Sequence, residues 1–593
     1  MQLARPLPTV WQAPPLRVAW RLVVDHHLAF LITAILLWVV GAPIVFLVTF
    51  SFRGGSVVSP GGLTLANYQA VYANPLTYTA LVNTGIYAAV VSVASLALAT
   101  LFAWLVERTD MPCRNWAWTM MLLPIAMPGM LASMAWILML SPKTGVINVA
   151  LRGLMGLFGA APDGGPLNIY TLPGMIFVES VRGSTTLFLM MVGAFRLMDP
   201  SMEEAATMAG ARVLTSLRRV TLGLVMPMLL AAWMYSFLGN LEDFETPLLI
   251  GLPAGIYVLP TLIFFTAYGA SGAQHGLASA YTSIFIVITV VLVLVYYRVI
   301  LRRTERFASV TGKGFRPRRT SLGRWRYAAL GLFLVFFAVT IGLPLLVLLW
   351  ASLLPVYEVP SAAALTKLSL AHYAELLRES QIVGAIGNTA LLAAVTATAT
   401  MALAFVVSWL VVRLKVRGGI ALDALSFIPH AIPSVAIGLA LVIFYLNPGM
   451  RWLPIYGTLW IITLALMTRY LAFASRTTNS AMTQVSKELE EAAATGGAGR
   501  IMTLFRITAP LLLPAFISGW IWVAAHTVRN LTLPLMLSTS GTQTIASTLY
   551  YYWQRKADFS LASALGVALL SCMAVAIFLA RKLVARGYSE APS

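Results

Sequence analysis

The residues with the most chemical potential are charged side chains within long apolar segments, because charge is costly to place in apolar surroundings. One such segment ends in Glu242, Asp243 and Glu245, and the equivalent segment 287 positions later carries Arg529 and Asn530. Two hypotheses follow. The acids could line a route and offer oxygen ligands or a negative potential to a cation. Alternatively, Glu242 could pair with Arg529 and fix the packing or a closed gate.

Two further arginines lie within apolar segments. Glu179 and Arg182 are three positions apart, so on a helix they share a face and can form an ion pair. Arg469 occupies the position equivalent to Arg182 in the second half of the chain, where the acid is missing. We interpret these residues as structural, through an ion pair or contacts to backbone carbonyls, and keep both arginines as candidates for lining a pathway.

The sequence predicts no catalytic residues and no metal ligands. The two cysteines, Cys113 and Cys572, are far apart and form no Cys-x-x-Cys pair. His430 follows Pro429 and is interpreted as a satisfied polar residue. No arrangement of nucleophile and base, and no metal-ligand spacing, is present that would indicate an enzyme.

The composition places these residues in a membrane. Of 593 residues, 59% are hydrophobic and 10% are charged, whereas about 25% are charged in soluble domains. Because lipid offers no partner to backbone N–H and C=O groups, we expect an all-α polytopic membrane protein. About twelve spans are predicted, near residues 28–50, 78–106, 117–140, 171–194, 223–250, 280–298, 328–353, 383–412, 420–446, 455–475, 511–537 and 561–580. The first run lacks a small-residue cleavage site, so we expect a retained span rather than a signal peptide.

The charge distribution predicts the orientation. The formal net charge is +19, and Lys and Arg are retained in cytoplasmic loops. Basic residues flank the first and last spans and fill a stretch between the halves, whereas residues 251–279 contain none. We therefore expect cytoplasmic termini in a bacterial inner membrane, an outer loop at 251–279 and no nucleic-acid partner. The expected boundaries are an N-terminal tail 1–27, a first six-span domain 28–301, a basic linker 302–326, a second six-span domain 327–582 and a C-terminal tail 583–593.

The two halves repeat each other in the same orientation. The matches at an offset of 305 are Asn83/Asn388, Trp104/Trp409, Arg108/Arg413, Pro124/Pro429 and Pro128/Pro433, and those at 287 are Arg182/Arg469, Gly210/Gly497 and Pro247/Pro534. The change of offset fits a longer outer loop near 141–166. The paired prolines predict a kink in the third span of each half. A parallel repeat suggests a pathway along a pseudo-two-fold axis normal to the membrane.

A short polar segment occurs between the fourth and fifth spans of both halves. The pattern is Glu-Ala-Ala, three residues, Gly and nine residues, followed by Val220-Thr-Leu or Ile507-Thr-Ala-Pro. Ala favours a helix, and Glu is favourable near a helix start. Because Ala and Gly present little bulk, another protein can approach closely. We predict a short helix and a turn, within cytoplasmic loops at 197–223 and 484–510, that dock into a partner. The motif residues are Glu204, Ala205, Ala206 and Gly210, and Glu491, Ala492, Ala493 and Gly497.

These segments resemble the EAA loop of binding-protein-dependent ABC importer permeases, in which Gly is followed by nine residues and I-x-L-P. The copies depart from it at Gly223, where the pattern has Pro, and at Ala509, where it has Leu. The resemblance implies two ABC ATPase subunits bound to the motif residues and a solute-binding protein outside. ATP and Mg²⁺ would be bound by those ATPase subunits, since the chain has no G-x-x-x-x-G-K-[ST] loop.

The fused layout, with Phe244-Glu245-Thr-Pro-Leu-Leu-Ile-Gly251 after the fifth span, is similar to ferric-iron importer permeases. This similarity implies ferric iron as the solute, while thiamine, phosphonate and polyamine permeases share the same plan. The alternative class is an ion-coupled secondary transporter with Glu242 and Asp243 as relays. That class leaves the two EAA segments without a role.

Overall fold

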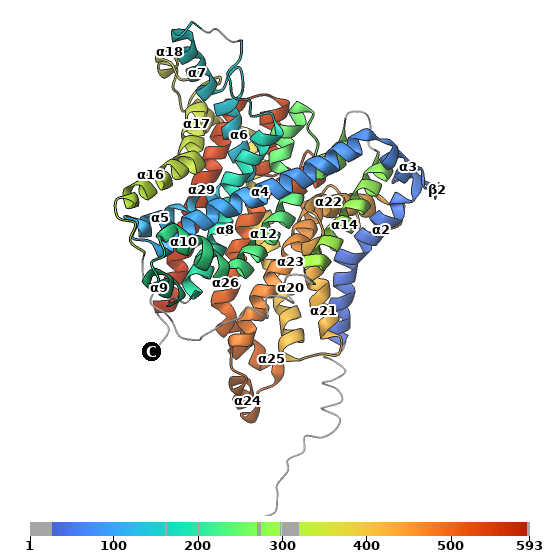
Figure 1. Cartoon of the computed structure of the whole chain (residues 1–593). Coiled ribbons are helices and arrows are strands. Elements are labelled where there is room, and N and C mark those ends of the chain that lie inside the picture. The colour runs from blue at the N-terminus through green and yellow to red at the C-terminus, as the bar shows by residue number, and fades with distance from the viewer. Residues whose placement is uncertain are drawn as a thin grey trace, which may run out of the picture.

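The structure is a computed structural model that describes residues 27–159, 163–198, 201–269, 274–296, 298 and 320–589. Residues 1–26, linker residues 302–319 and residues 590–593 of the predicted tail lie outside these ranges. Within them the regular structure is helical, apart from an antiparallel ribbon of β1 (Arg53–Gly55) and β2 (Pro60–Leu63) (Figure 1). The all-α expectation is confirmed.

The membrane-embedded part of each half is a bundle of long helices interrupted by short π- or 3₁₀-helical turns. In the first half these are η1 (Leu37–Gly41), α2 (Ala42–Ser51), α4 (Pro75–Arg108), α5 (Arg114–Met120), η2 (Leu123–Ala126), α6 (Gly129–Leu140), α8 (Leu172–Leu197), η3 (Leu217–Thr221), α11 (Leu222–Leu224), α12 (Met226–Leu241), η4 (Pro247–Gly251), η5 (Leu252–Ala254), α13 (Leu259–Tyr268) and α14 (His275–Tyr296). In the second half they are α16 (Trp325–Phe337), η7 (Ala338–Gly342), α17 (Leu343–Ser352), α20 (Ser380–Ser408), η8 (Trp409–Arg413), α21 (Gly419–Phe427), η9 (Ile428–Ala431), α22 (Ser434–Leu446), α23 (Leu459–Gln484), η11 (Leu504–Thr508), α26 (Ala509–Arg529), α27 (Thr532–Leu537), α28 (Ile545–Tyr550), η12 (Tyr551–Arg555) and α29 (Phe559–Ser589).

Smaller helices lie at the two ends of the bundle. They are α3 (Ala66–Ala73), α7 (Val146–Leu157), α18 (Ala362–Leu365), α19 (Ala371–Leu376), η10 (Pro448–Met450), α9 (Ser201–Met208), α10 (Val213–Ser216), α24 (Glu488–Thr495) and α25 (Arg500–Thr503). Figure 1 places α7 and α18 at the upper end, and α9 and α24 toward the lower end.

Among the described residues, eight helices are long and apolar enough to span a membrane, and four bent pairs raise the number to twelve. These spans match the predicted runs with two differences. The predicted outer loop 251–279 contains α13, which forms a pair with residues 247–254 bent by 75°. The segment is thus helical rather than a simple loop, and Leu259, Leu262 and Ile263 are buried, so it packs against the rest of the protein. The fifth span also ends at Leu241 rather than at 250.

The second difference concerns the predicted span 455–475. A 26-residue helix, α23, lies there, yet it is not among the helices apolar enough to count as a span by composition. Two arginines, Arg469 and Arg476, lower its hydropathy. Half of its residues are nevertheless buried, and it packs against α20 and α26, so α23 is enclosed by protein on those faces.

The third span of each half is broken at its second proline. Helical segments 114–126 and 129–140 meet at 96°, and segments 419–431 and 434–446 meet at 105°. The residue before each of these prolines, Met127 or Ile432, is extended, as steric contact with a following proline requires. The predicted kinks are confirmed. Each break leaves backbone N–H and C=O groups without helical partners, and they need partners from elsewhere.

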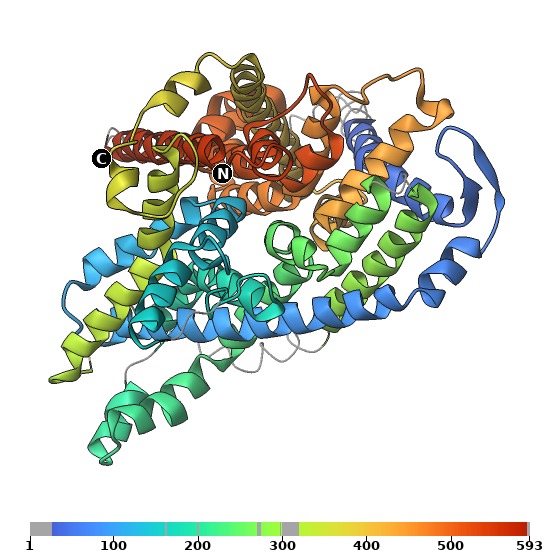
Figure 2. The same cartoon turned by 90° about the horizontal axis from the view of Figure 1, so that it is seen from above.

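The two halves are interlocked through their first spans. α4 packs against α8 and α12, and α20 packs in the same way against α23 and α26. The first spans contact both halves: α2 packs against α14 of its own half and α22 of the other half, and α17 packs mainly against α29 of its own half and also against α6 of the other half (Figures 1 and 2). The ring centroids of Trp38 and Phe46 lie 5.4 and 5.7 Å from that of Phe444. Neither half therefore completes its core alone.

Candidate functional site

The two EAA segments form short exposed helices followed by a left-handed turn, as predicted. α9 and α24 end before Gly210 and Gly497, whose φ angles are +82° and +84°. One residue later the N–H of Ala211 donates to the carbonyl of Ala206 at 3.0 Å, and the N–H of Ala498 donates to that of Ala493 at 2.9 Å. This is the hydrogen bond of a glycine-terminated helix cap. Glycine is needed there for its backbone conformation, since an added Cβ would meet nothing within 4 Å.

The motif side chains remain largely uncovered by the rest of the chain. Ala205, Glu491 and Ala492 are exposed, as are both glycines, whereas Glu204, Ala206 and Ala493 are half-buried. Met208 at the end of α9 is 90% exposed, and α24 buries no residue. These helices therefore present small and polar groups outward.

Each helix is held from behind by an acid that the sequence analysis did not single out. Glu203 forms an ion pair with Arg108, and Glu490 lies 3.4 Å from Arg413. The sequence feature that could have indicated these contacts is the recurrence of Arg108 and Arg413 at the offset of 305. A buried arginine needs an acidic partner. The acids that also recur in both halves are Glu203 and Glu490, each directly before the Glu of the EAA motif.

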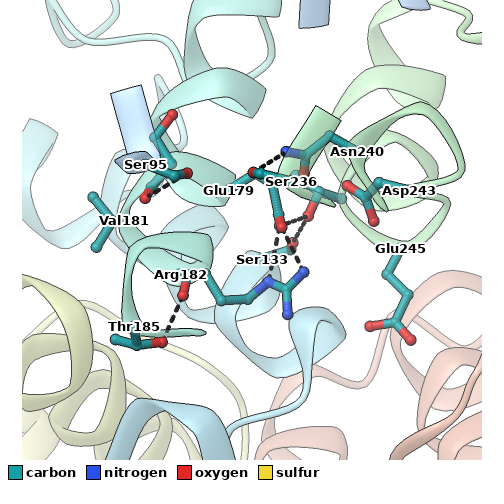
Figure 3. Close-up of polar contacts among 12 residues, drawn as sticks. Ser95, Ser133, Glu179, Val181, Arg182, Thr185, Ser236, Asn240, Asp243 and Glu245 are labelled. Carbon is teal, nitrogen blue, oxygen red and sulfur yellow. Dashed lines mark hydrogen bonds and ion pairs between the residues drawn. The ribbon is translucent and has the colours of Figure 1, made fainter. Parts of the chain in front are cut away.

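In the apolar interior, Glu179 and Arg182 form the predicted pair. Arg182 Nε and Nη2 donate to the two carboxylate oxygens at 2.8 and 2.5 Å (Figure 3). Glu179 also accepts a hydrogen bond from Thr246 Oγ1 at 3.3 Å and is 3% exposed. The pair joins α8 to the segment that follows α12.

The pairing of Glu242 with Arg529, one of the two hypotheses from the sequence, is wrong. Glu242 instead forms an ion pair with Arg469 of the opposite half, and its other oxygen accepts from the backbone N–H of Ser434 at 3.3 Å. Arg529 Nη1 donates to the carbonyl of Ile125 at 2.6 Å. The physical reason is the broken third spans: both residues satisfy exposed helix ends of the opposite half, rather than each other.

Glu245, Asp243 and Asn530 each have separate partners. Glu245 accepts from the N–H of Met130 at 3.0 Å, at the start of α6, and from that of Leu531 at 3.4 Å. Asp243 accepts from the Tyr87 hydroxyl at 2.5 Å, and Asn530 Nδ2 donates to the Tyr470 hydroxyl at 3.1 Å. Asp243 and Glu245 point in different directions in Figure 3.

The three acids after α12 thus do not converge as a ligand set. In the part of the chain that the structure describes, no three His, Cys, Asp or Glu side chains form a group that could hold a metal ion. The structure therefore contains an ion-paired network, in which the partner of Glu242 is Arg469. The signal for that partner was the missing acid: Arg182 has Glu179 one turn before it, whereas the equivalent position before Arg469 is Leu466.

A cavity of about 340 Å³, lined by both polar and apolar residues, lies where the two halves meet. Its charged lining consists of three carboxylates and three guanidinium groups: Glu179, Glu242, Asp243, Arg182, Arg469 and Arg529. Tyr235 and His430 also line it, whereas Glu245 and Asn530 do not. The formal charges balance, so the lining differs from the negative surface that the acidic segment alone suggested. We call these six charged residues the central cluster.

Parts of this chain are similar in sequence to known transport proteins. Residues 404–587 match the family described as binding-protein-dependent transport system inner membrane component. A ferric transport system permease protein of Actinobacillus pleuropneumoniae is 24% identical over 418 residues, which are 69% of this chain and 58% of that protein. The alignment therefore spans little more than half of that relative.

Permeases for other solutes also match. A putrescine transport system permease protein of Escherichia coli is 27% identical over 223 residues, covering 37% of this chain and 78% of that protein. A sulfate transport system permease protein of Escherichia coli is 26% identical over 262 residues, covering 42% and 93%. Together with the multi-pass helical architecture, these matches show a similarity to inner-membrane components of binding-protein-dependent transport systems.

Proposed function

We propose that this chain is the membrane-spanning permease of an ATP-driven importer, and that α9 and α24 are its coupling helices. The observation that carries the proposal is the repeated geometry of these helices. Both are short and exposed, both lie toward one end of the molecule, and both end in the same left-handed glycine turn. Two such helices suit two copies of one partner, here two ATPase subunits that bind ATP and Mg²⁺.

The proposed orientation follows from the coupling helices. The end of the molecule with α9 and α24 faces the cytoplasm, as do both termini and the basic linker. The opposite end, with α7 and α18, faces a solute-binding protein, and the family description supports dependence on such a protein. The domain boundaries proposed are 28–301 and 327–582, each with six spans in lipid.

The central cluster is proposed as a closed gate in the solute pathway. Glu242 and Arg469 join the two halves beside the cavity, and Arg529 joins them at Ile125. Movement of the halves must separate or exchange these contacts. Arg182, Asp243, Glu245 and Asn530 position the same segments through their own hydrogen bonds.

Ferric iron is the proposed solute. The similarity to the ferric permease covers 69% of this chain, whereas the sulfate and putrescine relatives cover 42% and 37%. The polyamine alternative retains support from the putrescine relative. Since the charged cavity lining is balanced, we assign the selection of the solute mainly to the binding protein.

Co-purification tests the class of transporter. The chain, purified in mild detergent from its host membrane, should carry an ATPase subunit at two copies for each permease. Glu204→Lys with Glu491→Lys should remove that subunit, because a cation replaces a surface acid on each coupling helix. Asp163→Lys, on the exposed outer loop, makes the same charge change away from the coupling helices and should retain it.

Uptake by proteoliposomes tests the activity. Binding protein loaded with ⁵⁵Fe(III), and ATP on the ATPase side, should give uptake that survives a protonophore. Radiolabelled putrescine and sulfate are the comparison solutes. Uptake of any of them without ATP, abolished by the protonophore, would instead establish the ion-coupled class.

A further inference from the structure

We propose that two repeated Arg–Glu–Thr triads connect the coupling helices to the central cluster and transmit their movement. The triads are Arg108–Glu203–Thr221 and Arg413–Glu490–Thr508. In this inference, which rests on the proposed function, these are positioning residues that lie behind the coupling helices rather than at the ATPase surface.

In the first triad, one carboxylate joins three elements. Arg108 is the last residue of α4 and is 1% exposed, and it forms an ion pair with Glu203 in the first turn of α9. Thr221 is the last residue of η3, and its hydroxyl donates to Glu203 Oε1 at 2.5 Å. The start of α9 is therefore held to the cytoplasmic ends of the second and fifth spans.

The second triad repeats this arrangement. Arg413 Nε lies 3.4 Å from Glu490 Oε1 in α24, and the hydroxyl of Thr508, the last residue of η11, donates to the same oxygen at 3.0 Å. Arg413 Nη2 also donates to the carbonyls of Met482 and Val485 at 2.9 and 2.7 Å. These carbonyls belong to the end of α23, so the second triad holds the fourth span as well.

The helices held by the triads reach the central cluster at their other ends. α4 carries Tyr87, which binds Asp243, and α12 follows Thr221 and ends beside Glu242. In the second half, α26 follows Thr508 and ends at Arg529, while α23 carries Arg469. A displacement of either coupling helix thus acts on helices that position the partners in the gate.

The triads suit this role because their arginines are buried: the side chains of Arg108 and Arg413 are 1% and 4% exposed. Arg108 and Arg413 would be left as buried cations if their acids moved away alone, which is strongly unfavourable. Separation is therefore resisted, and the arginine and its helix move with the coupling helix. The exposed motif residues make contact with the ATPase, and the preceding acid carries the movement into the membrane.

The test uses the permease–ATPase complex in proteoliposomes with loaded binding protein. Glu203→Gln combined with Glu490→Gln removes both charges at nearly constant size. The ATPase subunits should remain bound, while solute moved per ATP hydrolysed should fall at least about fivefold, the lower end of typical coupling between linked sites. In a separate variant, Arg108→Lys with Arg413→Lys retains the positive charges and should keep most of the wild-type ratio of solute moved to ATP hydrolysed.

Glu107→Gln is the matched control. Glu107 lies beside Arg108 and forms a separate ion pair with Arg196 at 2.7 Å at the same end of α4, so its loss should leave the ratio unchanged. If the double Gln variant does not accumulate, Thr221→Ala and Thr508→Ala remove only the hydroxyl links. Each should then lower the same ratio.

The outcomes separate the two proposals. A wild-type complex that couples to ATP while the Gln variants keep the wild-type ratio overturns the triads alone. Loss of the ATPase from those variants also overturns them, because it assigns the acids to docking. Wild-type transport with no ATPase bound overturns the proposed function itself.

Discussion

Glu242 and Glu245 lie three positions apart, yet their carboxylates stabilise the broken third spans of opposite halves. Glu242 accepts from Ser434 at the start of α22, and Glu245 accepts from Met130 at the start of α6. A carboxylate at a helix N-terminus contributes up to about 2 kcal/mol where it is partly buried. Glu242 and Glu245 therefore bind backbone N–H groups that the helix breaks leave without helical partners. Because Ser434 lies in the second half, the Glu242 contact also joins the two halves.

Exchange of the charges at Glu242 and Arg469 tests their pairing. Glu242→Arg and Arg469→Glu should each reduce uptake strongly, because each change replaces the ion pair with two like charges beside the cavity. The double exchange should recover part of the uptake, since the charges remain adjacent. Glu242→Arg with Arg529→Glu is the control and should give no recovery. Recovery in the control rather than in the Arg469 exchange would contradict the structure.

Gly129 provides the space for Glu245, because a Cβ at this position would lie 2.7 Å from Glu245 Oε2. Gly129→Ala should displace the carboxylate, leave the N–H of Met130 without its partner and destabilise the protein by about 1–3 kcal/mol. Thermal unfolding in detergent measures this change. Gly85→Ala, on an exposed face of α4 with nothing within 4 Å, is the control and should not destabilise.

At the scale of elements, the predictable features were those with a local cause. Pro128 and Pro433 act on the residue before them, so the breaks could be predicted. The EAA segments carried their own helix and glycine signals. The partner of Glu242 could not be predicted from equivalent positions, because the breaks expose backbone groups that compete for each charged side chain. The helix α13 was missed for a related reason: absence of Lys and Arg marks buried protein as well as an outer loop.

The glycine turn after each coupling helix gives a backbone prediction. Gly210→Ala or Gly497→Ala forces a non-glycine residue into the left-handed region, which costs about 1–2 kcal/mol and should favour a different exit from the helix. ATPase co-purification and uptake should both fall, with Asn less harmful than Ala. Gly499→Ala also places its Cβ in open space but without a positive φ, so it should retain both. Equal loss in all three would mean that bulk, rather than backbone conformation, is decisive.

At the scale of the whole molecule, the sequence repeat predicted two contiguous six-span domains but not that the first span of each half also packs against the other half. Hydropathy cannot distinguish an apolar face that meets lipid from one that meets another helix, because the two surroundings are equally apolar. The hydropathy of α2 therefore predicts only an ordinary first span, although α2 packs against α22. The contacts of α2 with α22 and of α17 with α6 hold the halves together away from the cavity. The halves can therefore move at the central cluster without separating.

Cross-linking tests the contact between α2 and α22 directly. In a chain with Cys113→Ser and Cys572→Ser and a protease site in the linker, Phe46→Cys with Phe444→Cys should be joined by a short bis-maleimide, because the two rings lie 5.7 Å apart. Cleavage of the linker should then leave one full-length band on a denaturing gel. Val45→Cys with Phe444→Cys is the matched control, since Val45 is 63% exposed whereas the neighbouring Phe46 contacts Phe444. Two separate fragments from the Phe46 pair would show that α2 does not pack against α22, and the interlocked arrangement would be wrong.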